Sequence, residues 1–530
     1  MNHIELFAGC GGLSLGLESV GFELTLANEL SPMAGETFAF NFLNENLAEK
    51  AQNGRLPEKV FWLSSQFATL APRLRENPFA YPPFGTGISD LPNDPMHLQG
   101  KLIIGNIIHL NQLIASNPTY LEAFKTSFGK GEVDLISGGP PCKSFSLAGL
   151  RKKDCDKNTL PWEFAKFVEA IQPKFVLLEN VTGILRPFRE DGIEYHAWFE
   201  ITKTFAERNY MPLCLHVNAR YVGVPQNRPR FILICVRKDI YDSISSKFSI
   251  TEQKLFEPSE VLFSDVAKGK EPSFSAFKYY DAQSDSDSDF FEKTFLSSLV
   301  GKKEVSIHEA IDDLKDFKNK NPSTHVKAVN AKFKKIVSLR GEIQNHDARS
   351  NNPHVQRRFR IYQILSQCRK TTINEVNSIL KGGASTLSND AWSELAAFKF
   401  LHLDGSIGNF TTAKELIIFL QQHPTKKQTQ KALIANLPAP AALSIPDDAC
   451  HYDEQQLRTL TVREMARVQS FPDGFVFRSK ITTGGQMRKF EVPQYTQVGN
   501  AVPPLLGAAL GEVINRLIDR VPYGPTIKRL

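Results

Sequence analysis

The stretch NHIELFAGCGGLSLGLESVGFELTLANE, residues 2–29, decides the fold class. The apolar run 4–7 predicts a buried strand, and Gly9, Gly11 and Gly12 break it. Leu13, Leu15, Leu17 and Val20 then indicate a helix, which ends at Gly21. A second apolar run, 24–27, ends on Asn28 and Glu29. This order of strand, glycine-rich loop, helix and strand is typical of the first unit of an α/β protein.

Strand-like runs recur along the first half of the chain, and helical patterns lie between several of them. They occupy residues 133–137, 175–178, 213–217 and 231–236. Strands that alternate with helices predict a doubly wound α/β sheet.

Two stretches depart from this alternation. Residues 41–100 are rich in Pro, Asn and Phe, and predict an irregular insertion in a first domain that spans residues 1–236. Residues 237–455 contain an SDSDSD segment and a basic segment at 349–369, and predict a separate, smaller lobe. Residues 456–530, with an apolar-faced helix near 505–518, are expected to return to the first domain.

Composition sets broad limits on the function. A chain of 530 residues allows two or three lobes, and a net charge of +6 weakly favours a polyanionic partner. The seven cysteines are scattered without a CxxC pair, so neither a disulfide framework nor a metal site is expected. No apolar run is long enough to cross a membrane, and the N-terminus does not resemble a signal peptide. We therefore expect a cytoplasmic protein without a membrane anchor.

The glycine-rich loop FAGCGG, residues 7–12, can let a ligand approach the backbone closely. Glu29, at the end of the next strand, is placed to accept hydrogen bonds from ribose hydroxyls. The pattern is not GxGxxG, so nothing favours a dinucleotide, and a plain tight turn is the alternative.

A second candidate site lies in GGPPCKSFS, residues 138–146, directly after a predicted strand. Two prolines stiffen the approach to Cys142, and the carboxyl end of a parallel strand is where such sheets bind ligands. A buried, unreactive cysteine is an equally weighted reading of this residue alone.

A carboxylate and two arginines complete the candidate chemistry. Glu179 follows an apolar run in ENV, and Arg228 and Arg230 occur in QNRPR before the next strand. Arginines two apart at a strand start project from one side and can meet a phosphate or a carbonyl. Taken singly, each residue is more often an ordinary surface or structural residue.

Taken in order, the motifs FAGCGG, NE, PPC, ENV, QNRPR, RTLTVREMARVQSFPD and QVGNAVPP resemble the cytosine-C5 DNA methyltransferase family. The resemblance covers the first 236 residues and about the last 75. It implies a doubly wound methyltransferase fold that uses S-adenosylmethionine, with residues 237–455 as an inserted target-recognition domain. The segment RTLTVREMARVQSFPD would pack the recognition domain against the catalytic core.

The resemblance also implies roles for the catalytic residues. Cys142 would attack C6 of a cytosine flipped out of duplex DNA, which prepares C5 to accept the methyl group. Glu179 would hold N3 and the exocyclic amine, Arg230 would contact O2, and Arg228 would help to hold the flipped nucleotide.

The cofactor and DNA contacts follow by the same resemblance. Cofactor contacts would come from Phe7, Ala8, Gly9, Cys10, Gly11, Gly12, Leu13, Glu29, Asn106, Ile107, Pro141, Leu160 and Asn500. DNA contacts would come from Lys143, Ser146 and Arg151 in a lid that follows Cys142.

Three features depart from the family pattern. Asn106 replaces the usual aspartate of a Gly-Asp-Ile element, and Lys143 replaces the usual glutamine after the nucleophile. The segment between Glu29 and Asn106 is much longer than usual. The first two substitutions put the adenine contact and the loop contact near the flipped base in doubt.

Two alternatives remain beside the DNA enzyme. One branch of the family methylates tRNA with the same motifs, although a recognition lobe of about 220 residues favours duplex DNA. A catalytically silent DNA-binding homologue is disfavoured because Cys142, Glu179, Arg228 and Arg230 are all present. We expect a monomeric enzyme of a prokaryotic or phage restriction-modification system, with a companion endonuclease as a possible partner.

Overall fold

A computed structural model describes most of the chain. The described residues are 1–141, 159–190, 193–315, 321–339, 341–425, 430–441 and 444–522. Four of the expected functional residues, Cys142, Lys143, Ser146 and Arg151, lie outside these ranges.

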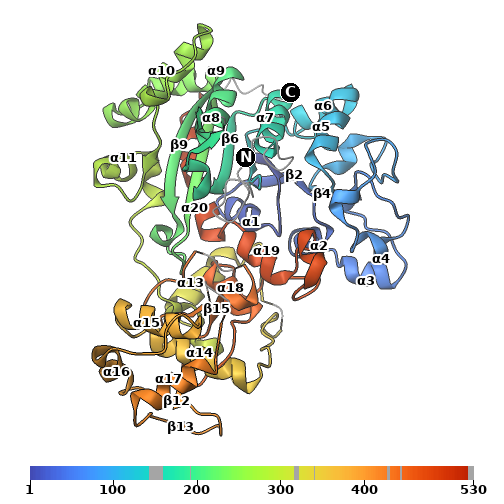
Figure 1. The fold of residues 1–530 in the computed structure, drawn as a ribbon. Coiled ribbons are helices and arrows are strands. Elements are labelled where there is room, and N and C mark those ends of the chain that lie inside the picture. Colours follow the sequence, from blue (N-terminus) through green and yellow to red (C-terminus); the bar gives the residue numbers. More distant parts are fainter. Residues whose placement is uncertain are drawn as a thin grey trace.

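A mixed sheet forms the centre of the larger lobe (Figure 1). Within the described residues its order is β11-β9-β10-β6-β5-β1-β2-β4-β3. The strands are parallel except that β10 runs antiparallel to both β6 and β9. The bounds are β1 (Asn2–Leu6), β2 (Glu23–Glu29), β3 (Val60–Trp62), β4 (Lys101–Ile104), β5 (Leu135–Gly138), β6 (Phe175–Val181), β9 (Tyr210–Asn218), β10 (Pro229–Arg237) and β11 (Tyr280–Asp281).

Helices cover both faces of this sheet, which confirms the doubly wound α/β prediction. One apolar core lies under α5 (Ile107–Ser116), α6 (Pro118–Lys125), α7 (Leu160–Ile171) and α8 (Ala197–Glu207). The opposite core lies under α1 (Gly12–Glu18), α9 (Lys238–Ser245) and α20 (Pro504–Ile518). The central strands β1 and β5 are buried along their whole length, as expected for strands covered on both faces.

The C-terminal helix α20 packs directly on α1. A Cβ on Gly16 would lie 2.5 Å from the Ala508 nitrogen, and one on Gly12 would overlap the Val502 carbonyl oxygen. Both positions therefore require glycine for the two helices to meet. None of the single helices in the described ranges is long and apolar enough to cross a membrane; the bent pair 485–500 and 504–518 satisfies the length and composition criteria only jointly.

The long segment between β2 and β4 is more regular than the sequence indicated. It begins with α2 (Pro32–Phe42) and continues through α3 (Leu47–Gln52), β3 and α4 (Leu70–Arg73). Strand β3 pairs with β4 and forms one edge of the sheet. The irregular insertion expected over 41–100 thus supplies a strand to the catalytic lobe.

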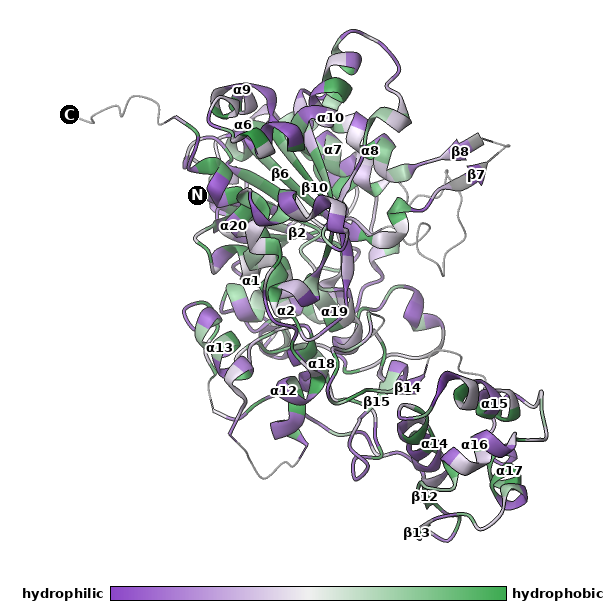
Figure 2. Cartoon of the chain, turned by 90° about the vertical axis from the view of Figure 1, so that its left-hand side faces the viewer, coloured by the Kyte–Doolittle hydropathy of each residue, from purple (hydrophilic) through white to green (hydrophobic). Residues whose placement is uncertain are grey.

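The expected recognition lobe, residues 237–455, divides between the two lobes. Helices α9 and α10 (Ile250–Ala267) pack on the sheet, β11 pairs with β9, and α11 (Ser288–Glu292) follows. A separate helical lobe has its own apolar core, and both views show it apart from the sheet (Figures 1 and 2). It contains α14 (Pro353–Leu365), α15 (Lys370–Leu380), α16 (Asn389–Leu395), α17 (Ala413–Gln421) and the short strands β12 (Phe400–Leu401), β13 (Ile407–Gly408), β14 (Lys431–Ala432) and β15 (Ala449–Cys450).

Helix α18 (Val462–Val468) joins the lobes through a third apolar core shared with α12 (Ile307–Ile311) and α13 (Thr324–Phe333). Its polar side chains are buried in ion pairs. Arg458 donates to both carboxylate oxygens of Glu464 at 2.8 and 2.7 Å, and Arg467 donates to both of Asp473 at 2.7 and 3.0 Å. Arg467 also donates to Asp313 Oδ1 at 2.6 Å, and this ion pair fixes α18 against the segment that follows α12.

Replacing Glu464 by glutamine is expected to lower the free energy of unfolding by about 3 kcal/mol, because it leaves Arg458 buried without its countercharge. Urea denaturation measures the loss. The matched control is Glu454→Gln, which removes a 68% exposed carboxylate paired with Arg360 and should cost less than about 1 kcal/mol. Equal losses in both variants would contradict a special role for the buried pair.

His451 makes the junction between the lobes sensitive to acid. Burial lowers the pKa of His451 to about 4, although the carboxylate of Glu464 opposes the shift. Since folding favours the neutral ring, its stabilisation is complete above the unfolded pKa of about 6.5 and declines as pH falls towards 4. We expect a loss of up to about 3 kcal/mol by pH 4. Urea titrations at several pH values should show a flatter pH dependence in His451→Gln; an unchanged dependence would refute this assignment.

Candidate active site

The glycine-rich turn between β1 and α1 opens at the carboxyl edge of the sheet. Phe7, Gly9 and Gly11 have positive φ angles of 55°, 57° and 96°. The turn is fixed by hydrogen bonds from the Ala8 nitrogen to the Asn28 oxygen and from the Gly11 nitrogen to the Ala8 oxygen. A Cβ on Gly9 would meet no atom within 4 Å, so a ligand can approach the backbone there.

Glu29 lies across this turn at the end of β2. Its carboxylate accepts hydrogen bonds from the Gly9 and Ser31 nitrogens, each at 2.8 Å. Burial raises the pKa of Glu29, and these backbone donors partly oppose the rise. The carboxylate is therefore held in one orientation, with its remaining lone pairs available to hydroxyl groups.

The other expected cofactor residues surround the same edge. Asn106 caps α5 by accepting from the Ile108 nitrogen at 3.0 Å, which leaves its amide hydrogens available as donors. Ile107 is buried and Leu160 is half-buried at the start of α7, whereas Pro141 and Asn500 are exposed. The side-chain amide of Asn106 can donate a hydrogen bond to a ring nitrogen. An aspartate at this position, as in the usual Gly-Asp-Ile element, could only accept one.

A buried carboxylate and arginine lie on neighbouring strands. Glu179 on β6 and Arg230 on β10 form an ion pair with 2.6 Å between Oε1 and Nε, and each side chain is about one-tenth exposed. A Cβ on Gly139 would lie 3.1 Å from Glu179 Oε2, so the carboxylate adjoins the chain that leads to Cys142. The pair can present an acceptor and donors to one polar planar ring.

Asn180 connects the two motifs that contribute to this site. Its side-chain amide donates to the Pro140 carbonyl oxygen at 3.1 Å. The end of β6 is thereby tied to the segment that follows β5 (Leu135–Gly138), directly before Cys142. This contact fixes the end of β6, with Glu179, relative to Pro140, which precedes Cys142 by two positions in the sequence.

The sequence profile of the C-5 cytosine-specific DNA methylases matches residues 1–60 and 116–516. The chain belongs to this family. It is accordingly a cytosine-C5 DNA methyltransferase.

Curated relatives match over almost the whole chain. The type II methyltransferase M.DdeI of Desulfomicrobium norvegicum is 25% identical and covers 98% of this chain and 90% of its own length. M.Bpa9945I of Bacillus paralicheniformis is 27% identical, with 97% and 99% covered.

Solved structures align at low similarity. A prophage-encoded E. coli protein described as a DNA modification methyltransferase is 20% identical, with 98% of this chain and 99% of that chain covered and a TM-score of 0.44. The Dnmt2 methyltransferase of S. pombe is 11% identical, with 99% of each chain covered and a TM-score of 0.41.

Two residues of this methyltransferase have surroundings that differ from the expectation. The thiol of Cys10 is buried against the Gln497 carbonyl oxygen at 3.7 Å, so only its backbone faces the ligand side of the turn. Arg228 is buried and donates to the carbonyl oxygens of Gly499 and Ala501 at 2.8 and 3.0 Å. Burial and the charge of Arg230 lower the pKa of Arg228. Its guanidinium thus holds the C-terminal QVGNAVPP segment against β10, which favours a positioning role over contact with a nucleotide.

The sequence analysis did not single out Gln497. Its side-chain amide donates to the Met33 and Val492 carbonyl oxygens, and its oxygen accepts from the Thr37 hydroxyl at 2.6 Å. These bonds join α19 (Gln494–Asn500) to α2 beside Glu29. Gln497 is the first residue of the QVGNAVPP motif, and its place in that motif is the feature of the sequence that could have identified it.

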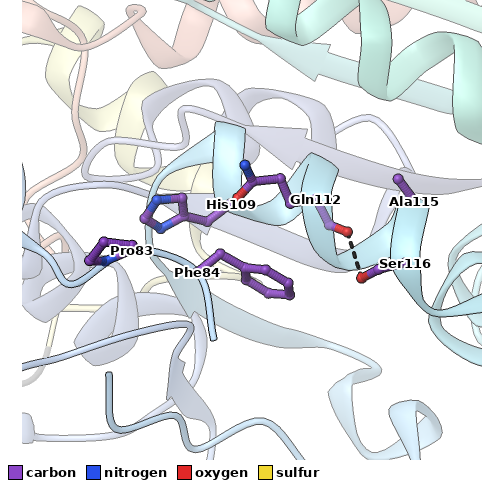
Figure 3. Close-up of a pocket in the computed structure, with 6 residues that line it drawn as sticks. All are labelled: Pro83, Phe84, His109, Gln112, Ala115 and Ser116. Carbon is purple, nitrogen blue, oxygen red and sulfur yellow. Dashed lines mark hydrogen bonds between the residues drawn. The ribbon is translucent and has the colours of Figure 1, made fainter. Parts of the chain in front are cut away.

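A further pocket of about 500 Å³ lies beside α5 (Figure 3). Pro83 and Phe84 face the outer side of α5, where His109 and Gln112 complete the lining with Ala115 and Ser116. Burial lowers the pKa of His109. None of the expected site residues lines this pocket. Within the described ranges, no group of three or more His, Cys, Asp or Glu side chains is arranged to hold a metal ion.

Proposed function

We propose that the enzyme methylates C5 of a cytosine in a specific duplex DNA sequence, with S-adenosylmethionine as methyl donor and Cys142 as covalent nucleophile. The observation that carries the proposal is the buried Glu179–Arg230 pair next to the segment that leads to Cys142. Both side chains of the pair are largely buried, which suits the binding of a base that has been flipped out of the duplex.

The turn at residues 7–12 fits the cofactor. The open space above Gly9, the fixed carboxylate of Glu29 and the amide donors of Asn106 match a ligand with a backbone-binding end, ribose hydroxyls and an adenine. When bound, S-adenosylmethionine supplies an electrophilic methyl group.

The remaining chemistry comes from the chain. The Cys142 sulfur forms a bond to C6, and the electron pair of the C5–C6 double bond makes C5 nucleophilic. Glu179 and Arg230 hold N3, the exocyclic amine and O2 while charge develops in the ring. After C5 has gained the methyl group, loss of its proton restores the double bond and releases the thiolate.

The described cysteines support Cys142 as the nucleophile. Burial raises the pKa of Cys10, Cys214, Cys235 and Cys450, and raises that of Cys368 to about 11. A thiolate is the reactive form, so all five are poor candidates. Of the seven cysteines, Cys142 and Cys155 remain, and only Cys142 directly follows the Pro140–Pro141 segment beside Glu179.

The names of the relatives, type II methyltransferases, support a proposal for the biological setting. We infer a cytoplasmic, monomeric enzyme that protects host DNA within a restriction-modification system, with a companion endonuclease as partner. The helical lobe α14–α17 would read the target sequence in the major groove.

Transfer of tritiated methyl groups tests the proposal. The wild-type protein is incubated with labelled S-adenosylmethionine and duplex DNA, total tRNA or no acceptor, and bisulfite sequencing then locates the product. Label in DNA cytosine is expected. Label in tRNA alone would move the enzyme to the tRNA branch of the family, and no transfer despite cofactor binding would favour a silent DNA-binding homologue.

A further inference from the structure

A basic loop precedes α19, at residues 480–491. Lys480 Nζ and Thr483 Oγ1 both donate to the Glu491 carboxylate at 2.5 Å, which closes the base of the loop. Arg488 Nε donates to the Thr483 oxygen at 3.3 Å across it. The 480–491 loop is therefore an ordered projection, and the side chains of Arg488 and Lys489 are exposed on it.

Hydrogen bonds to α2 and to the start of α19 hold the base of the 480–491 loop in place. At its base the Gln494 nitrogen donates to the Lys480 oxygen at 2.9 Å, and the Ser479 nitrogen donates to Glu36 Oε1 on α2 at 3.2 Å. Figure 1 shows this red segment beside α2 and leading into α19. A rigid base means that the cations on the loop occupy a defined place.

Helix α19 links this loop to the catalytic strands. It runs from Gln494 to Asn500, about 10 Å at 1.5 Å per residue. At its far end, Gly499 accepts a hydrogen bond from Arg228, which neighbours the Glu179–Arg230 pair. The length of α19, about 10 Å, therefore separates the loop from the proposed cytosine site. A DNA duplex is wide enough to contact both.

A third exposed cation lies near the base of the loop. Arg349 is exposed on the segment that enters the helical lobe, four positions after Asn345, whose side-chain amide donates to Gln494 Oε1 at the base of the loop at 3.1 Å. The same segment also carries the exposed carboxylates of Glu342 and Asp347. The carboxylate of Glu491 is already paired with Lys480, so it does not cancel the charges of Arg488 and Lys489 on the loop.

We propose that Arg488 and Lys489 on the 480–491 loop, together with Arg349, bind the phosphate backbone of duplex DNA that flanks the target cytosine. The inference rests on the proposed function and adds a contact surface to it. Phosphate contacts carry no sequence information, but they fix the register of the protein on the duplex. The loop would hold the DNA between the sheet lobe and the helical lobe.

The double variant R488Q/K489Q tests this surface. Fluorescence anisotropy with a labelled duplex, across a series of salt concentrations, gives the slope of log K against log[salt]. Each lost phosphate contact reduces the steepness by about 0.9, so a decrease of about 1.8 is expected. Affinity at about 0.1 M salt should fall about 10- to 60-fold, by a similar factor for cognate and unrelated duplexes.

K302Q/K303Q is the matched control. It removes two adjacent exposed lysines from the connection beside Tyr221, whose oxygen accepts from the Lys302 nitrogen. Its salt slope should equal that of the wild type, and both variants should bind S-adenosylmethionine and melt like the wild type.

The outcomes separate the two proposals. A wild-type slope in R488Q/K489Q, or an equal decrease in the control, overturns the role of the loop while DNA methylation by the wild type still supports the proposed function. A wild-type protein that binds no duplex overturns both.

Discussion

Replacing Cys142 by serine is expected to reduce methyl transfer by at least about 10³-fold, while binding of DNA and of S-adenosylmethionine persists. A serine hydroxyl is far less ionised than a thiol at neutral pH and is a weaker nucleophile towards C6. Loss of the nucleophile alone can cost on the order of 10⁶-fold in the rate of a covalent enzyme, so 10³-fold is a lower bound. Single-turnover transfer of tritiated methyl groups measures the change.

Cys155→Ser is the matched control, because Cys155 is the other cysteine left after the five described thiols are set aside. It should transfer methyl groups at a rate close to that of the wild type. A second readout reports the covalent bond itself: a duplex with 5-fluorocytosine at the target blocks loss of the C5 substituent and should trap the wild type, but not Cys142→Ser, on a denaturing gel. If Cys142→Ser were trapped on the duplex, or if Cys155→Ser were not, the assignment of Cys142 as the nucleophile would be contradicted.

The central part of the sheet could be predicted because its strands carry their own signal. Residues 175–178 are a continuous apolar run, residues 4–7 and 133–137 are mainly apolar, and β1, β5 and β6 are buried on both faces. The positions of Glu29 and Glu179 near the carboxyl ends of β2 and β6 could be predicted because each residue follows a mainly apolar run. Their local sequence therefore determines both their element and their position.

Boundaries that depend on tertiary contacts could not be predicted in this way. β11 has two residues, and its place in the sheet comes from pairing with β9, more than 60 positions earlier in the chain. The same limit applies to single side chains. Nothing near Arg228 in the sequence indicates that its guanidinium binds the Gly499 and Ala501 carbonyl oxygens, which lie some 270 positions later. A motif gives a residue's chemical type, but its partners depend on how distant segments meet.

Glu179→Gln is expected to lower the rate of methyl transfer by about 10² to 10⁴-fold, because the amide keeps the shape of the side chain and loses both its charge and its ability to exchange a proton. The Glu179 carboxylate and the Arg230 guanidinium are 2.6 Å apart and shielded from water, so their charges act on a bound ring with little screening. Since the base is held most strongly when charge develops, the loss should fall on the rate of the chemical step more than on DNA affinity. Single-turnover kinetics and duplex binding measure these two quantities separately.

Glu163→Gln makes the same chemical change at another buried glutamate, on α7, where the carboxylate pairs with Lys166 and accepts from the Asn111 side chain. It should leave the single-turnover rate within about threefold of the wild type, because the Glu163 side chain does not contact the proposed cytosine site and its loss acts only on local packing and charge. If Glu179 acts through proton exchange, the pH dependence of the rate should also differ between the wild type and Glu179→Gln. A glutamine variant that lost duplex affinity in proportion to its rate, with an unchanged pH profile, would instead assign Glu179 to binding alone. Equal loss in both glutamine variants would trace the effect to a damaged fold.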